Sequence, residues 1–214
     1  MPRSPHTVSD VMTRTPIAVG RRASYREIVE LLARWKVSAL PVLEGDGRVV
    51  GVVSEADLLP KEVYRDAEPP LQDSLKASGL YADQLMSSPA ITVHADATIA
   101  EAARIMARRG VKRLPVVNSA GLLEGVVSRG DLLKVFLRPD EDIAAEIRDG
   151  VLGAMPAASE LQVVVADGVV TVGGLLTDRR LVPLLMRAAQ AVEGVVDVRL
   201  DLQAHAIAGS ENAP

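Results

Sequence analysis

The chain has 214 residues and a formal net charge of −4; 48% of its residues are hydrophobic, but only 2% are aromatic. The absence of cysteine excludes a disulfide framework, a thiolate nucleophile and a cysteine-ligated metal, and the scarcity of aromatic rings disfavours stacking platforms for single-stranded nucleic acid. No apolar run reaches the length of a membrane span, and the first six residues lack the apolar stretch of a secretory signal, so we expect a cytoplasmic protein.

Charge is distributed unevenly along the chain. Residues 1–139 carry 19 Lys and Arg against 16 Asp and Glu, whereas residues 140–205 carry 5 against 11. This change of sign predicts a domain boundary near Pro139.

The first part of the chain contains the same predicted elements twice, 74 residues apart. Each copy starts with an extended segment, at residues 17–19 and 91–93. A helix follows, whose first turn has the capping-box pattern, Ser24 with Glu27 and Thr98 with Glu101. Two strands around a glycine-marked turn come next and lead into another helix. These strands are predicted at 39–43 and 49–53, and at 114–117 and 122–127.

The order β-α-β-β-α in each copy predicts an α/β (α+β) fold with pseudo-two-fold symmetry and two related clefts. In the first helix the apolar face is formed by Ile28, Leu31, Leu32 and Trp35. Trp35 is therefore expected in the core or as an interface anchor. Met12 and Met86, which begin the two copies, are expected to be packing residues.

The remaining segments repeat nothing. Residues 60–82 form a polar, proline-containing linker with at most a helical turn. Beyond it we expect a helix over 142–152 and a hairpin of 161–165 and 169–172 around Asp167-Gly168. A helix over 178–192 should have Leu181, Leu184, Leu185 and Ala188 on one side, and a strand over 195–202 should follow it. The predicted domains are 1–59, 60–82 (linker), 83–139, 140–203 and 204–214, the last a disordered tail.

The two copies agree best at residues poorly suited to filling a core. Gly51-Val-Val-Ser54-x-x-Asp57 recurs as Gly125-Val-Val-Ser128-x-x-Asp131. Each serine is expected at a helix N-cap, where unpaired backbone N–H groups favour an anion or hydroxyls. The aspartate can accept both hydroxyls of a ribose, and the serine can donate to a phosphate or sugar oxygen. Local capping alone would also explain the pattern, but the retained Gly-Val-Val and the Asp in place of Glu favour binding.

Residues 8–59 and 82–133 resemble the CBS domain family, named after cystathionine β-synthase, whose tandem pairs form Bateman modules. The resemblance rests on the start Asp10-Val-Met12-Thr-Arg-Thr15-Pro16 (again at 84–89), on the Leu-Pro-Val strand, and on the Ser-x-x-Asp ending. It implies a non-catalytic sensor that binds AMP, ADP, ATP or S-adenosylmethionine as a regulatory ligand, and a homodimer that relays occupancy to a protein partner or to the C-terminal domain.

The resemblance also implies roles for individual residues. Asp57 and Asp131 would hold ribose hydroxyls, and Ser54 and Ser128 a phosphate or sugar oxygen; the family commonly has threonine in place of these serines. The adenine walls would be Thr15, Pro16, Ile17, Val37, Ser38 and Ala39 in one cleft. In the other cleft they would be Ser88, Ala90, Ile91, Val111, Lys112 and Arg113.

The second copy is richer in cations, with Arg108, Arg109, Lys112, Arg113 and Arg129. Because the planar guanidinium forms two parallel hydrogen bonds to phosphate, we expect unequal sites, with the phosphate-bearing ligand at the one holding Arg129. A solvated basic surface explains the cluster equally well, and nucleic-acid binding would require a steep salt dependence.

No metal or catalytic site is expected. The three histidines, His6, His94 and His205, stand singly without metal-ligand spacing. The chain has neither a glycine-rich phosphate loop nor a nucleophile beside a patterned base.

Residues 140–203 resemble a BON domain, a small α/β module of bacterial envelope and osmotic-stress proteins. The resemblance rests on the hairpin, on Gly173-Gly174-Leu175 and on the strand that follows Gly194. It implies attachment to phospholipid or to a partner protein, and the excess of acidic residues disfavours the lipid. A ligand-free alternative stays open, in which the CBS-like pair is a dimerisation scaffold that presents the BON-like domain.

Overall fold

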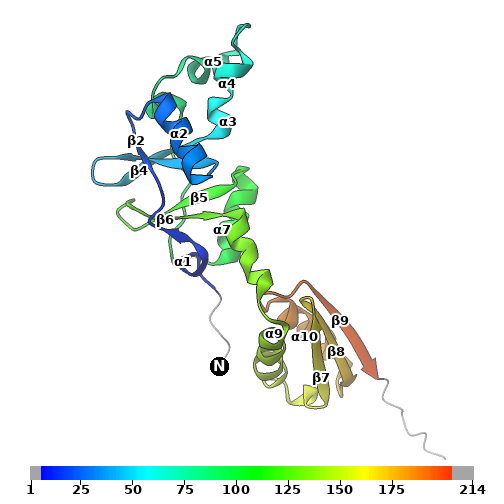
Figure 1. Cartoon of the computed structure of the whole chain (residues 1–214). Helices are drawn as coiled ribbons and strands as arrows, with labels where there is room; N and C mark the ends of the chain where they lie inside the picture. The colour runs from blue at the N-terminus through cyan, green and yellow to red at the C-terminus, as the bar shows by residue number, and fades with distance from the viewer. Residues whose placement is uncertain (1–5, 204–214) are drawn as a thin grey trace, which may run out of the picture. The chain divides into compact units, whose positions relative to one another are not determined.

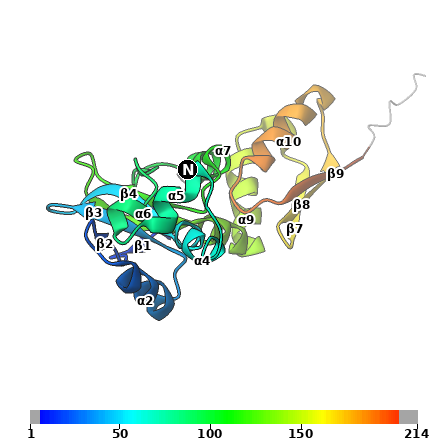
Figure 2. The same ribbon diagram turned by 90° about the horizontal axis from the view of Figure 1, so that it is seen from above.

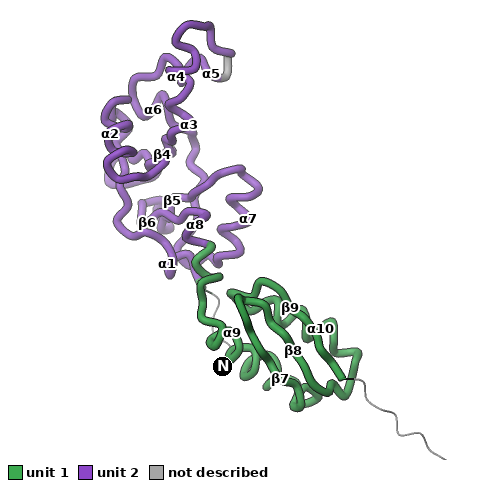
Figure 3. Tube along the Cα trace, turned by 45° about the vertical axis from the view of Figure 1, so that its right-hand side comes forward, with its two compact units in different colours: residues 1–6, 133–214 green, residues 7–132 purple. Residues whose placement is uncertain are grey.

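The structure is a computed structural model that describes residues 6–203, apart from the side chains of Leu71 and Gln72. The predicted disordered tail lies outside the described residues. The chain divides into two compact units. The first unit (purple, labelled unit 2 in Figure 3) contains Thr7–Leu132, and the second (green, labelled unit 1) contains His6 and residues 133–203.

The first repeat of the first unit has the β-α-β-β-α order that the sequence predicts (Figure 1). In the second repeat the strand predicted at 91–93 is reduced to a single bridge between Val93 and Val116, and the helix, two strands and helix that follow keep the predicted order. The elements of the first repeat are α1 (Val8–Val11), β1 (Thr13–Arg14), β2 (Val19–Gly20), α2 (Tyr25–Trp35), β3 (Ala39–Glu44), β4 (Arg48–Ser54) and α3 (Glu55–Leu58). The linker and second repeat contain α4 (Pro60–Val63), α5 (Leu71–Ser78), α6 (Ala82–Leu85), α7 (Ile99–Arg109), β5 (Arg113–Val117), β6 (Leu123–Ser128) and α8 (Arg129–Leu132).

Both long helices begin at the predicted caps. The Ser24 hydroxyl accepts the N–H of Glu27 at 3.3 Å, and Thr98 accepts the N–H of Glu101 at 3.2 Å. Ile28 and Leu32 of α2 are buried, but Trp35 is 51% exposed. Trp35 lies in the last turn, beside the left-handed C-cap Lys36, and its ring lies under the Arg34 guanidinium. Trp35 is therefore not a core residue of this unit.

The two repeats exchange their opening segments. Thr13 of β1 pairs antiparallel with Val126 of β6, in the sheet of the second repeat. In return, Ser87 pairs with Val52 of β4, through N–H···O bonds of 2.9 and 3.1 Å. Positions 13 and 87, like 52 and 126, are equivalent in the repeat, so the exchange obeys the pseudo-two-fold symmetry.

This exchange explains why both repeats keep a glycine in the second strand. A Cβ on Gly125 would lie 2.7 Å from the sulfur of Met12 and 2.9 Å from the carbonyl oxygen of Thr13. A Cβ on Gly51 would overlap the sulfur of Met86 in the same way. The packing role predicted for the two methionines is confirmed.

The linker is more helical than the sequence predicted. Pro60 occupies the first turn of α4 and Pro70 is the N-cap of α5, positions at which proline costs no backbone hydrogen bond. The ammonium of Lys61 donates to the carbonyl of Ala77 at 3.0 Å, and the Tyr64 hydroxyl donates to Asp73 at 3.0 Å. These bonds tie α4 to α5 in one helical hairpin.

The second unit contains a three-stranded sheet of order β7-β8-β9, antiparallel between β7 and β8 and parallel between β8 and β9. In both views α9 and α10 lie beside these strands (Figure 1; Figure 2). Its elements are η1 (Leu133–Leu137), α9 (Asp140–Glu146), η2 (Ile147–Leu152), η3 (Pro156–Ala158), β7 (Leu161–Ala166), β8 (Val169–Leu175), η4 (Arg179–Leu181), α10 (Val182–Gln190) and β9 (Asp197–Gln203).

The predicted hairpin turn is confirmed. Asp167 and Gly168 have φ of 51° and 72°, the positive values that a two-residue type I′ turn requires. The carboxylate of Asp140 accepts both of their N–H groups, at 2.8 and 2.9 Å.

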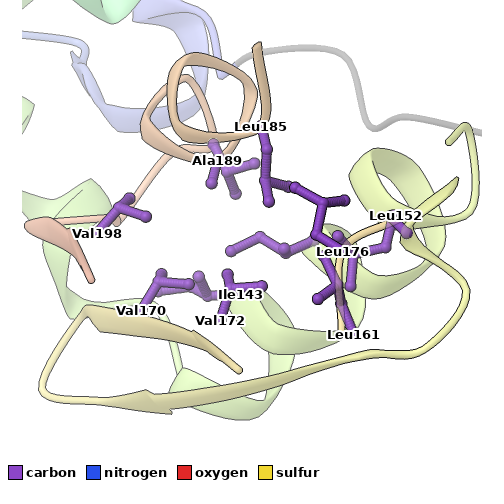
Figure 4. Packing of buried hydrophobic residues seen from close by; sticks show 12 residues of the cluster. Ile143, Leu152, Leu161, Val170, Val172, Leu176, Leu185, Ala189 and Val198 are labelled. Atoms are coloured by element: carbon purple, nitrogen blue, oxygen red, sulfur yellow. The ribbon is translucent and has the colours of Figure 1, made fainter. Parts of the chain in front are cut away.

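The core of this unit lies between α10, α9 and the sheet, where Leu185 and Ala189 face Val170 and Val172 (Figure 4). Leu184, which we expected on the same side as Leu185, is 53% exposed. Leu184 and Leu185 lie about 100° apart around α10, and it is Leu185, with Ala189 one turn later, that belongs to the core.

Residues 133–138 pack with the second unit, although the sequence placed the boundary at Pro139. The Arg138 guanidinium donates to the carbonyl of Glu193 at 2.7 Å and to the carboxylate of Glu146 at 2.8 Å. None of the helices in residues 6–203 has both the length and the apolar composition that a bilayer crossing requires.

Candidate functional site

A cavity of about 440 Å³ opens in the first unit, at the carboxyl end of β4. Small-molecule sites usually measure roughly 300–1,000 Å³. Both repeats contribute to its walls because Ser87 and the residues after it cross to the sheet of the first repeat. The lining residues are Ser38, Ala39, Val52, Ser54, Glu55, Ala56, Asp57 and Leu59, together with Ser87, Pro89, Ala90, Ile91, Gly110, Val111, Lys112 and Arg113.

Asp57 is a buried polar residue, only 7% exposed, on the wall of this cavity. Its Oδ2 accepts the backbone N–H of Ser54 at 2.8 Å and the Ser54 hydroxyl at 2.6 Å. Its Oδ1 accepts the Ser87 hydroxyl at 3.2 Å and forms an ion pair with Lys76 of α5. Asp57 therefore caps α3 with one oxygen and holds the linker and the second repeat with the other.

Asp131 makes the same capping bonds at the end of β6. Its Oδ2 accepts the N–H of Ser128 at 2.9 Å and the Ser128 hydroxyl at 2.6 Å. The neighbouring Arg129 is turned toward the backbone, and its guanidinium donates to the carbonyl oxygen of Val111 at 3.1 and 3.3 Å.

Two cations of the second repeat reach the cavity. The half-buried Arg113 guanidinium donates to the Ser38 hydroxyl at 2.5 Å and to the Ala39 carbonyl at 3.4 Å. Burial lowers the pKa of Arg113, against the opposing effect of the Glu55 and Asp131 charges, but a guanidinium stays protonated in proteins. Lys112 is exposed and lines the same cavity. Lys76 pairs with Asp57, and Lys112 and Arg113 add positive charge to a cavity whose wall also contains Glu55.

The CBS domain family matches residues 8–62 and 82–138, together more than half of the chain, and the BON domain family matches residues 139–204. The chain belongs to the CBS domain family. It is a tandem CBS pair followed by a BON domain.

Among relatives, the uncharacterized protein MJ1426 of Methanocaldococcus jannaschii is 31% identical over 153 residues, which cover 61% of this chain and 90% of that protein. Two further relatives, from the same organism and from Methanopyrus kandleri, are covered over only 31% and 58% of their length.

Among solved structures, CBSX2 in complex with AMP has a TM-score of 0.56 and 30% identity, and the match covers 62% of this chain and 97% of that one. CBSX2 is a chloroplastic CBS domain-containing protein of Arabidopsis thaliana. The CBS domain pair of MJ0100 in complex with 5′-methylthioadenosine and S-adenosylmethionine has a TM-score of 0.53 at 20% identity over 62% of this chain and 97% of that one. The MJ0100 likeness bears on the fold alone.

The structure divides the predicted wall residues differently from the sequence analysis. Ser38 and Ala39, which we assigned to one cleft, line a single cavity with Ala90, Ile91 and residues 111–113, which we assigned to the other. The reason is the exchange of opening segments, which brings the second repeat over the end of β4. Predicted site residues outside this lining are Thr15, Pro16, Ile17, Val37, Ser88, Ser128, Arg129 and Asp131.

Sequence reasoning missed the two side chains that bind Oδ1 of Asp57, Ser87 and Lys76. It also missed the lining residues Val52, Glu55, Ala56, Leu59, Pro89 and Gly110. Ser87 could have been found, because it is equivalent to Thr13 and adjoins the predicted wall. Lys76 gave no signal: it is one charged residue among many in a segment read as a linker.

Proposed function

We propose that the CBS pair binds an adenosine-containing nucleotide in the cavity beside Asp57, and that the protein is a non-catalytic regulator. The observation that carries this proposal is a buried carboxylate of the Ser-x-x-Asp motif on the wall of a cavity of about 440 Å³ lined by both repeats. The likeness to CBSX2, solved with AMP at 30% identity, supports AMP as the first ligand to test. ADP, ATP and S-adenosylmethionine follow it.

In the proposed complex Asp57 accepts the ribose hydroxyls, and Ser54 and Ser87 supply hydroxyl donors nearby. Ala39, Ile91 and Val111 give the apolar contacts that an adenine ring needs. Lys112 and Arg113 provide positive charge for a phosphate. Asp131 with Ser128 and Arg129 would serve a second site of lower or different affinity.

Regulation requires that the ligand bind two arrangements of the protein with different affinity. The exchanged strands offer the means, because rotation of one repeat relative to the other changes the Thr13–Val126 and Ser87–Val52 pairings. We propose that this rotation is relayed to the BON domain or to a protein partner in the cytoplasm. A homodimer would cover the exposed Val29 and Trp35 of α2.

Calorimetry tests the proposal. AMP, ADP, ATP and S-adenosylmethionine are titrated into the wild type, Asp57→Ala and Asp131→Ala. We expect AMP to bind the wild type and Asp57→Ala to weaken binding at least about tenfold, because an acceptor for the sugar hydroxyls is lost. Mass spectrometry of any ligand that co-purifies would identify the physiological one.

A ligand-free dimerisation scaffold is the second candidate. It is favoured by the hydrogen bonds of Asp57, whose two oxygens are both engaged within the chain. Absence of heat with every adenosine compound, combined with a dimer in light scattering, would select this candidate over the nucleotide sensor.

A further inference from the structure

Lys76 links the α4–α5 hairpin to the candidate nucleotide site. It lies in α5, and its ammonium contacts both the carboxylate of Asp57 and, at 3.4 Å, the Ser87 hydroxyl. The position 74 residues earlier is Pro2, so the repeat supplies no corresponding lysine for Asp131. The lysine of this contact is therefore not part of the sequence repeat.

The contact occupies the acceptor that a ribose would use. An ionised carboxylate offers about four lone-pair positions, and Asp57 receives four donors: two from Ser54 and one each from Ser87 and Lys76. A ribose diol brings two further donors, so two of the present ones have to leave.

Lys76 is the donor best able to move. The N–H of Ser54 is fixed at the cap of α3. A serine hydroxyl, of Ser54 or Ser87, frees one acceptor position by rotating toward the ligand, and Lys76 frees the other by leaving. The Lys76 side chain is 29% exposed and has a flexible four-carbon stem whose ammonium is readily hydrated.

We propose that Lys76 is a built-in competitor of the nucleotide, an intramolecular cation that the ribose displaces from Asp57. This inference rests on the proposed function. A ligand that displaces Lys76 weakens the binding of α5 to Asp57. Because the coupling is reciprocal, the contact between α5 and Asp57 lowers the affinity for the ligand by the same factor. Because the bonds of Lys61 and Tyr64 tie α5 to α4, release of Lys76 would free the hairpin as one piece and so report occupancy outside the sheets.

The test compares Lys76→Met with the wild type in the full chain, by calorimetry with adenosine and with AMP. We expect both ligands to bind about tenfold more tightly to Lys76→Met, because a charge-assisted hydrogen bond no longer has to be broken. The gain should vanish when Asp57→Ala is also present. Phosphate recognition should survive, since Lys112 and Arg113 remain in the cavity.

Lys61→Met is the matched control. It removes the same charge from the same hairpin, but its ammonium contacts Ala77 and not Asp57. We expect its affinities to equal those of the wild type. As a second readout, AMP should accelerate hydrogen exchange of residues 71–78 in the wild type and leave it unchanged in Lys76→Met.

The outcomes separate the two proposals. If the wild type binds AMP but Lys76→Met binds no more tightly than Lys61→Met, Lys76 is not a competitor, and nucleotide binding stands. Weaker AMP binding with unchanged adenosine binding in Lys76→Met would make Lys76 a phosphate ligand and overturn competition. If neither the wild type nor any variant binds an adenosine compound, the proposed function fails, and the competitor fails with it.

Discussion

The two Ser-x-x-Asp motifs have nearly identical local geometry and different surroundings. In each, Oδ2 of the aspartate accepts the serine N–H at 2.8 or 2.9 Å and the serine hydroxyl at 2.6 Å. Yet Asp57 is held by a lysine from the linker helix, whereas the second motif contains Arg129, whose guanidinium donates to the Val111 carbonyl. The capping hydrogen bonds are therefore made by residues that both repeats share. The other contacts of each aspartate are made by residues that the repeats do not share.

The largest expected effect comes from breaking the exchange that makes the two motifs comparable. Gly125→Ala should lower the free energy of unfolding by about 2–3 kcal/mol. The added Cβ would lie 2.9 Å from the backbone oxygen of Thr13, which cannot rotate away. Urea denaturation of the full chain followed by circular dichroism measures the effect.

Gly20→Ala is its control, because a Cβ at Gly20 meets nothing within 4 Å. An unchanged midpoint for Gly125→Ala would show that β1 does not pack on β6 as described.

A smaller difference should separate the two aspartates in stability. Asp57→Ala should cost about 2 kcal/mol, because the partly buried Lys76 ammonium and three donors of Ser54 and Ser87 lose their acceptor. Asp131→Ala, which removes the capping carboxylate of α8 at a less buried site, should cost less, about 1 kcal/mol, because its donors can be hydrated more easily. Thermal and urea unfolding of both variants measure this difference, and equal losses would contradict the asymmetry.

Arg113 and Arg129 distinguish the cavity beside Asp57 from the predicted site around Asp131. Arg113→Met should weaken AMP binding about tenfold and leave adenosine binding nearly unchanged, because a bond between guanidinium and phosphate is lost. Arg129→Met should have a smaller effect, since its guanidinium is engaged by Val111. Calorimetry with AMP and adenosine measures both effects. A larger loss of AMP affinity in Arg129→Met than in Arg113→Met would instead support the sequence prediction that phosphate is bound at Arg129.

The smallest effect tests the third position of the Ser-x-x-Asp motif. Gly130 of α8 corresponds to Ala56 of α3, and a Cβ there would lie 3.7 Å from the nearest atom, the Ser128 hydroxyl oxygen. Gly130→Ala should therefore raise stability by about 0.5–1 kcal/mol, through a less flexible unfolded chain. A lower melting temperature would show that the second motif needs backbone freedom that the first does not.

Local signals in the sequence predicted the order of elements, the caps at Ser24 and Thr98 and the turn at Asp167-Gly168, because each depends on residues close in sequence. The strand exchange could not be predicted, since pairing of Thr13 with Val126 depends on contacts between residues more than 100 positions apart. The exposure of Trp35 and Leu184 could not be predicted either. Periodicity identifies the apolar side of a helix, but it does not show which residues on that side are covered by the rest of the protein.

The site was only partly predictable for the same reason. The Ser-x-x-Asp motif identified both aspartates, but grouping the wall residues by repeat put Ser38 and Lys112 in different clefts. Lys76 lies 19 residues after Asp57 along the chain and reaches it only because the linker folds into helices, which its prolines begin rather than prevent.

Hydrogen–deuterium exchange of the full chain with and without AMP is the most direct test of nucleotide binding beside Asp57, because it locates the ligand. When AMP binds, we expect slower exchange in peptides covering residues 52–57, 87–91 and 111–113, and faster exchange in residues 71–78. Unchanged exchange throughout the CBS pair at saturating AMP, or protection confined to residues 139–203, would contradict this expectation.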